Sequence, residues 1–151
     1  MVKRFSLVLT AVLFVIAVAG VGTAIAADFG TAAEAKAMLE KAVAAIKADK
    51  AKALEMFTKG EGGFKDRDLY PFCGGPDGNF TAHPKLVGKS LKELKDKAGK
   101  ALGAEMYKVA KEGKISEVGY MWPRPGSDEP VQKVSFVTKA ADQVCAVGYY
   151  K

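Results

Sequence analysis

The stretch that decides the fold is Arg67–Pro84, RDLYPFCGGPDGNFTAHP. It predicts two short strands, Leu69–Cys73 and Asn79–His83, because Tyr, Phe and Thr on both sides suit a pleated, half-buried surface. A Gly-Pro-Asp-Gly turn joins them, in which Pro76 sets φ at the second position and Gly78 accepts a positive φ. We expect the chain before this hairpin to be helical and the chain after it to complete one small sheet.

The N-terminal segment has the organisation of an export signal. Lys3 and Arg4 form a basic start, Phe5–Ile16 is apolar, and Ala24-Ile25-Ala26 is an A-x-A cleavage site. We therefore expect residues 1–26 to be a cleaved signal peptide. The apolar run is also long enough to cross a bilayer, so an uncleaved N-terminal anchor is the alternative, and only then is the membrane a partner.

The mature chain, residues 27–151, is long enough for one domain with one core, and we expect to find it in the periplasm or secreted. Removing the two basic residues of the signal from the 23 in the chain leaves 21 against 17 acidic side chains, a net charge of +4. The lysines are spread along every segment without a dense run. A nucleic-acid partner is therefore not expected.

The chain has two cysteines, Cys73 and Cys145. Their wide spacing excludes a C-x-x-C redox pair and a C-x-x-C-H haem site, and a single histidine leaves a structural zinc site short of ligands. We expect no metal and no cofactor. Export allows a disulfide, and two buried free thiols are the alternative.

A capping box at Thr31-Ala32-Ala33-Glu34 predicts the start of a helix, because the hydroxyl and the glutamate can each accept a hydrogen bond from an amide that the helix leaves free. Apolar residues then recur at helical spacing, with lysines and glutamates on the other side. We expect one long amphipathic helix over about residues 31–59, broken near Asp49 and ended by Gly60.

The remaining chain predicts short helices and then strands. Short helices are expected at Ser90–Leu94 and Ala101–Glu112, and strands at Ile115–Trp122, Val131–Lys139 and Gln143–Tyr150. A loop rich in proline, PRPGSDEP, separates the first two of these strands. Strands and helices segregated in this way indicate an α+β fold with one antiparallel sheet and helices packed on it.

Four runs of the chain resemble the single-Cache family of extracytoplasmic, PAS-like small-molecule sensor domains: DLYPFCGGPDGNFTAHP, LVGKSLKELKDKAGKAL, VGYMWPRPGSDEPVQKVSFV and the closing VGYYK. The resemblance extends over Thr31–Lys151. It implies a five-stranded antiparallel sheet in the order 2-1-5-4-3 behind a long N-terminal helix, with short helices covering it. That order places the strands of Cys73 and Cys145 side by side and so supports a disulfide between them.

The resemblance also implies a pocket for a small molecule, in many family members a short carboxylate. The positions that match the family's binding residues are Tyr120, Trp122 and Pro123 on the third strand, Lys133, Ser135 and Phe136 on the fourth, and, less directly, His83 and Tyr70 in the first hairpin. The family usually has a tyrosine where this chain has Phe136, so one hydroxyl is missing.

The chemistry of these side chains suits an anion. A small carboxylate needs a cation or fixed donors on one side and an apolar wall for its carbon chain. Lys133 can supply the charge, and Trp122 and Tyr120 can donate hydrogen bonds. Phe136 can form the wall. The alternatives are that the two aromatic residues on one strand face belong to the core, that the lysine is solvated, and that His83 is a structural histidine rather than a pH sensor.

These features predict an exported sensor domain that binds a small, anionic metabolite. Because no receptor, kinase or membrane segment follows Lys151 in this sequence, we expect a separate membrane receptor or kinase to receive the signal. The alternative is a periplasmic structural or interaction domain with no open pocket. We do not expect an enzyme, since the chain lacks a nucleophile motif, a metal-ligand cluster and paired acids at a telling spacing.

Overall fold

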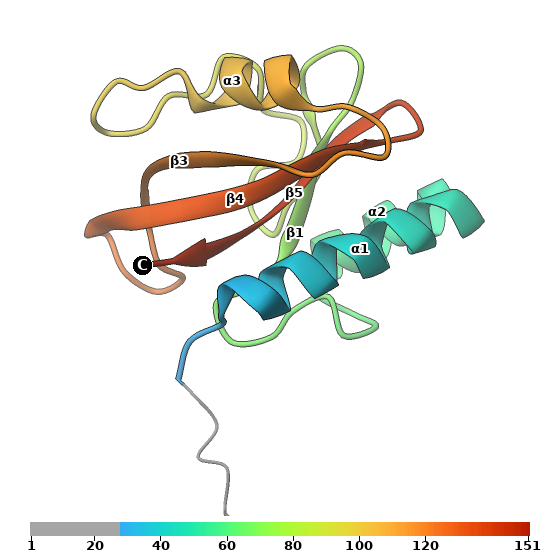
Figure 1. The fold of residues 1–151 in the computed structure, drawn as a ribbon, viewed down its shortest axis with the longest axis horizontal. Helices are drawn as coiled ribbons and strands as arrows, with labels where there is room; N and C mark the ends of the chain where they lie inside the picture. The colour runs from blue at the N-terminus through green and yellow to red at the C-terminus, as the bar shows by residue number, and fades with distance from the viewer. Residues whose placement is uncertain (1–27) are drawn as a thin grey trace, which may run out of the picture.

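A five-stranded antiparallel sheet with the order β2-β1-β5-β4-β3 is the centre of the fold (Figure 1). The computed structural model describes residues 28–151, so the predicted signal peptide, residues 1–26, lies outside the described residues. The strands are β1 (Pro71–Gly74), β2 (Phe80–Ala82), β3 (Ser116–Pro123), β4 (Pro130–Ala140) and β5 (Gln143–Tyr150). The predicted α+β class and the strand order implied by the resemblance are confirmed.

The turn between β1 and β2 has the predicted chemistry. The Gly78 amide donates to the Gly75 carbonyl at 3.0 Å, and Gly78 has a φ of 88°. The Asp77 carboxylate accepts the Asn79 amide at 3.1 Å. Both strands are shorter than predicted; β1 begins later because Leu69 closes a separate tight turn with Asp66.

The predicted long helix is two helices, α1 (Ala32–Ala48) and α2 (Lys50–Lys59). Thr31 and Glu34 form the predicted capping box at the start of α1. Asp49 breaks the helix with an extended backbone, and its carboxylate caps α2 by accepting the Lys52 amide at 3.1 Å. The same carboxylate chemistry that disfavours a helix interior therefore starts the second helix.

Only one of the two later helices is present. The predicted helix at Ala101–Glu112 is α3 (Leu102–Val109). The prediction of a helix at Ser90–Leu94 is wrong, because this segment is a turn. Its Leu91 and Lys92 amides both donate to the Gly78 carbonyl of the first hairpin, and such tertiary hydrogen bonds replace the helical ones.

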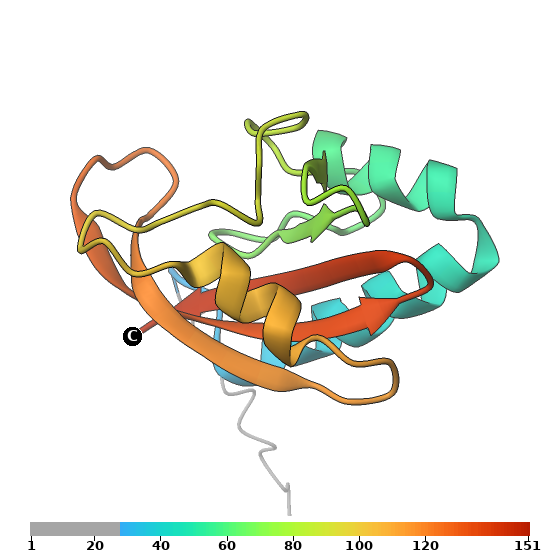
Figure 2. The same cartoon turned by 90° about the horizontal axis from the view of Figure 1, so that it is seen from above.

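The sheet separates two apolar clusters. On one face α1 and α2 bury a cluster that includes Leu39, Phe57, Phe136 and Val147. On the other face α3 and the chain before it cover a cluster that includes Phe72, Met106, Tyr120 and Val137. Figure 2 shows α3 and α1 on opposite sides of the strands.

The two cysteines form a disulfide between the central strands β1 and β5. Cys73 lies directly opposite Cys145 in the strand register, with a Cα–Cα distance of 4.1 Å. The alternative of two free thiols is therefore wrong. Both cysteines belong to the cluster on the α1 side of the sheet, so the disulfide lies on the face opposite to α3.

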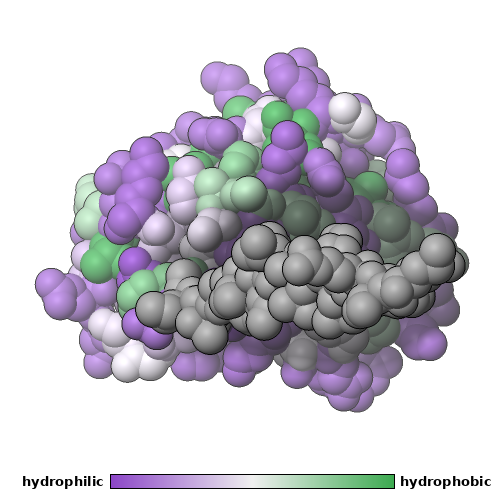
Figure 3. Space-filling model, turned by 60° about the horizontal axis from the view of Figure 1, so that its bottom comes forward, coloured by the Kyte–Doolittle hydropathy of each residue, from purple (hydrophilic) through white to green (hydrophobic). Residues whose placement is uncertain are grey.

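The outer surface is largely hydrophilic in the view of Figure 3. Among the described residues, the exposed large hydrophobic side chains are Phe29 and Val87. Within residues 28–151 we also find no helix that is both long and apolar enough to cross a membrane.

Candidate ligand-binding site

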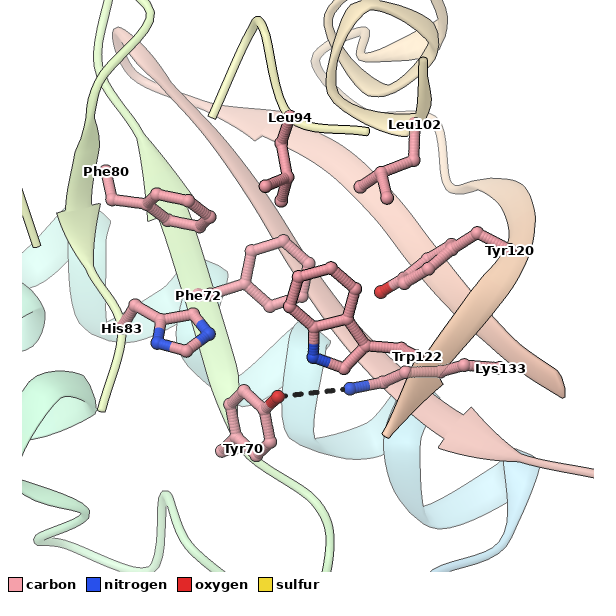
Figure 4. Close-up of a pocket in the computed structure, with 9 residues that line it drawn as sticks. All are labelled: Tyr70, Phe72, Phe80, His83, Leu94, Leu102, Tyr120, Trp122 and Lys133. Atoms are coloured by element: carbon pink, nitrogen blue, oxygen red, sulfur yellow. Dashed lines mark hydrogen bonds between the residues drawn. The ribbon is translucent and has the colours of Figure 1, made fainter. Parts of the chain in front are cut away.

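A small cavity lies on the α3 side of the sheet, with a volume of about 10 Å³, enough for about one water-sized group. Its walls come from β1, β2, β3, β4, the turn before α3 and α3 itself (Figure 4). The lining residues are Tyr70, Phe72, Phe80, His83, Leu94, Leu102, Tyr120, Trp122 and Lys133.

The cavity brings together five of the eight residues expected at the site: Tyr70, His83, Tyr120, Trp122 and Lys133. Trp122 and Lys133 therefore share one face of the sheet and line the same cavity. Ser135 lies next to them, fully buried, and its hydroxyl is 2.8 Å from that of Tyr120.

The other two predicted residues lie elsewhere. Pro123 lines a larger outer pocket, and its carbonyl accepts the Tyr150 hydroxyl at 2.7 Å. Phe136 lies on the opposite face of the sheet, in the α1 cluster, with its ring 5.7 Å from that of Tyr149. The expectation that Phe136 forms a wall of the cavity is therefore wrong, because alternate residues of a strand point to opposite faces.

The ammonium group of Lys133 is the most unusual feature of the cavity. The side chain is 1% exposed. Its Nζ donates to the Tyr70 hydroxyl at 3.2 Å and lies over the rings of Tyr70 and Tyr150, at 4.6 Å and 4.7 Å from their centroids. No carboxylate within the described part of the chain forms an ion pair with it. An ammonium group has three N–H donors, so Lys133 has donors to spare for a ligand.

Burial governs the protonation of Lys133. Desolvation lowers its pKa from 10.5 to about 7, and the more distant Asp68 carboxylate opposes this shift. The lysine can therefore be charged or neutral near neutral pH, and an anion placed beside it would favour the charged form.

The phenols around Lys133 stay protonated. Burial raises the pKa of Tyr70 to about 12, and it raises the pKa of Tyr120 and of Tyr150 further. Each hydroxyl can therefore donate a hydrogen bond at physiological pH. The Tyr120 hydroxyl forms a hydrogen bond with Ser135. The Tyr70 hydroxyl accepts a hydrogen bond from Lys133, and its own proton can be donated to another acceptor.

His83 is a neutral wall of the cavity. Its Nδ1 accepts the Lys85 amide at 2.9 Å, so its proton is on Nε2. Burial, together with the charges of Lys133 and Lys85, lowers its pKa to about 4. The ring packs edge-on against Phe80 and Tyr70. These contacts and the lowered pKa suit a structural histidine, the alternative to a pH sensor.

A second, outer pocket of about 560 Å³ adjoins the cavity. Tyr70, His83 and Trp122 line both spaces, so these three side chains form the partition between them. Lys133 lines the cavity but not the outer pocket.

An ionic cluster ties this region to the start of α1. The buried Asp68 carboxylate accepts the Gly30 amide at 2.7 Å and the Arg124 guanidinium at 2.6 Å. The guanidinium lies between the rings of Phe29, at 4.0 Å, and Tyr150, at 4.6 Å. Tyr150 thus contacts Arg124 as well as Lys133, which links the site to the segment that precedes α1.

Four apolar residues that line the cavity were not predicted from the sequence. Phe72 lies two residues after Tyr70, and strand alternation could have placed both on one face. Phe80 could have been found in the same way from the paired strand. Leu94 and Leu102 lie on a turn and on a helix, and no local pattern shows that these meet at the sheet.

Comparison with known proteins agrees with this architecture. The family model of the Cache domain matches residues 31–150. The methyl-accepting chemotaxis protein McpP of Pseudomonas putida is 39% identical over 56 residues, which are 37% of this chain and 10% of that protein. The crystal structure of a methyl-accepting chemotaxis protein from Vibrio parahaemolyticus has a TM-score of 0.64 at 26% identity, covering 78% of this chain and 86% of that one.

A structure that explains carboxylic acid recognition by a Cache chemosensory domain has a TM-score of 0.59 at 25% identity, covering 76% of this chain and 84% of that one. The sheet order, the covered face with its cavity and the family match over nearly all described residues agree with one another. The chain therefore belongs to the Cache domain family of sensory domains.

Proposed function

We propose that this domain is an extracytoplasmic sensor that binds a small organic carboxylate at Lys133, and that the occupied domain acts on a membrane receptor or a kinase. The observation that carries the proposal is the buried ammonium group with no carboxylate partner in the described residues. A buried charge without a counterion destabilises a fold unless something compensates for it. A carboxylate ligand supplies that compensation.

The surroundings of Lys133 select the ligand's size and shape. The ammonium group and the Tyr70 hydroxyl can both donate to a carboxylate. Phe72 and Leu102 offer an apolar wall to a short carbon chain. Because the cavity holds only a water-sized group, even a short acid must displace the partition outward, which favours the smallest members of the class. The carboxylic acid recognised by a related Cache chemosensory domain supports this choice of ligand class.

Ligand binding would act as a population shift. An anion at Lys133 displaces the partition and changes the charge beside Tyr150, whose ring also contacts Arg124. Arg124 holds Asp68, and Asp68 holds Gly30. This chain of contacts gives the site a physical route to the segment that enters α1.

A thermal-shift screen tests the proposal. Formate, acetate, propionate, pyruvate and lactate should raise the melting temperature further with each increase in concentration, because a ligand that binds only the folded state stabilises it. Acetamide and propionamide have nearly the same shape as acetate and propionate but carry no charge. These two amides should leave the melting temperature unchanged. If no acid in the panel shifts the melting temperature, the sensor hypothesis fails. The alternative, a structural or interaction domain with no open pocket, then takes its place.

Binding should weaken as the pH rises through about 7. The anion binds the charged form of Lys133, whose pKa is lowered to about 7, so above that pH binding must also take up a proton. Far above it, affinity should fall about tenfold for each further pH unit. His83 is neutral above pH 5 and Tyr70 keeps its proton, so neither contributes. Titrations followed by fluorescence of Trp122, the chain's single tryptophan, should show this decline between pH 6 and 9; a flat profile contradicts it.

A further inference from the structure

Lys133 reaches the cavity by crossing a neighbouring strand. It lies on β4, whereas its hydrogen-bond partner Tyr70 immediately precedes β1. In the sheet order, β5 lies between these two strands. The lysine side chain therefore runs sideways over β5 instead of standing upright on β4, and anything that β5 presents on that face lies underneath it.

The residue of β5 that lies under the Lys133 side chain is a glycine, Gly148. Gly148 of β5 pairs with Ser135 of β4 and is buried. A methyl group built on Gly148 would overlap Cε of Lys133 and Oγ of Ser135, and it would lie 3.3 Å from Cδ of the lysine. The stem of the lysine thus occupies the place of the missing side chain.

The neighbours of Gly148 complete a trough across the sheet. On the same face of β5, Ala146 lies on one side of it and the large ring of Tyr150 on the other. The Tyr150 ring pairs directly with Lys133 in the register and lies beneath its ammonium group. On this face of β5, Ala146 is small, Gly148 has no side chain and Tyr150 is large. The low point at Gly148 is the place where the lysine side chain crosses the strand toward Tyr70.

The backbone gives no other reason for a glycine here. Gly148 is not one of the glycines with a positive φ, so any residue could adopt its conformation. Glycine weakens the interior of a strand, and it is found there where another group must approach the backbone closely. At Gly148 the group that approaches is the lysine stem.

We propose that Gly148 is a positioning residue for ligand binding: its missing side chain opens the trough along which Lys133 crosses β5 and presents its ammonium group to the cavity. The proposal rests on the proposed function, in which that ammonium group holds the ligand's carboxylate. It adds that the anion site depends on β5, a strand that contributes no charged group to it.

The test compares two glycine-to-alanine variants of the same sheet. Gly148→Ala should reduce the affinity for the best acid of the thermal-shift screen at least tenfold, read from Trp122 fluorescence. The binding that remains should no longer decline as the pH rises through 7, because a displaced ammonium group regains water. Gly119→Ala on β3 is the control, since its methyl group would meet nothing closer than 3.9 Å, and it should bind as the unaltered domain does.

The outcomes separate this inference from the function on which it rests. If the unaltered domain binds the acid, Lys133→Met does not, and Gly148→Ala binds with unchanged affinity and pH profile, the role of Gly148 is overturned and the function stands. If Lys133→Met still binds the acid, the proposed function itself fails.

A double-mutant cycle covers the case in which Gly148→Ala folds poorly. In a Lys133→Ala background the lysine stem is gone, so the added methyl group overlaps only the Oγ of Ser135. The loss of melting temperature caused by Gly148→Ala should then be much smaller than in the unaltered domain. An equal loss in both backgrounds would show that the methyl group collides with something other than Lys133, and it would overturn the inference.

Discussion

Replacing Lys133 by methionine should abolish binding of the organic acid and, at the same time, raise the stability of the domain. Methionine has a similar length and no charge, so the trough over β5 stays filled. The pKa of Lys133 is lowered from 10.5 to about 7, which means that the unfolded chain binds its proton more tightly than the folded domain does. The unliganded domain should therefore gain on the order of 2–4 kcal/mol at pH 7.

The pH dependence of folding stability gives a second check on the role of Lys133. Between about pH 7 and 10.5 the unfolded state holds a proton that the folded state has released, so the folded domain becomes more stable as the pH rises. Lys133→Met lacks this dependence. The stability difference between the variant and the unaltered domain should be largest at and below pH 7 and should shrink toward pH 9, as measured by urea unfolding.

Lys139→Met is the matched control, because it makes the same chemical change on the same strand at an exposed position. It should change neither ligand affinity nor stability by more than a small amount. A Lys133→Met domain that is less stable than the unaltered one, or that keeps its affinity for the acid, would show that the buried lysine serves the fold and not a ligand.

Replacing both cysteines by alanine should lower the melting temperature by roughly 10–20 °C, given a loss on the order of 4 kcal/mol for a disulfide that closes a loop of this length. Cys73 and Cys145 are 72 positions apart, so the cross-link removes many conformations from the unfolded chain. Differential scanning calorimetry of the oxidised domain and the double variant measures the effect. A difference of only a few degrees would contradict it.

Ligand affinity serves as the control for the double variant. The disulfide lies in the cluster on the α1 side of the sheet, whereas the cavity lies on the α3 side. At a temperature where both proteins are folded, the acid should therefore bind equally well with and without the cross-link. A large loss of affinity would mean that the disulfide also determines how β1 and β5 present Tyr70 and the trough at Gly148.

Much of the fold could be predicted from local chemistry. Pro76 and Gly78 marked the hairpin turn, Thr31 and Glu34 marked the helix start, and Asp49 marked the break, because each acts on backbone groups only a few residues away. The turn at Ser90–Leu94 could not be predicted in this way. Its amides bond to the Gly78 carbonyl, and that contact exists only after the fold has formed.

The site was predictable to the extent that strand alternation applies. Tyr120 and Trp122 share a face because they are two residues apart, and Lys133 joins them through the register of β3 and β4. The same alternation places Phe136 on the other face, so an assignment carried over from a family pattern failed where strand geometry opposed it. The role of Gly148 had no local signal, since it depends on a side chain from the adjacent strand.

The crystal structure of the domain with the best acid of the screen is the most direct test of the central claim that the Lys133 ammonium group is the anion site. We expect a carboxylate oxygen within about 3 Å of both Lys133 Nζ and the Tyr70 hydroxyl, with Tyr70, His83 or Trp122 displaced to admit the carbon chain. A carboxylate bound only in the outer pocket, with Lys133 still in contact with Tyr70 alone, would contradict the claim.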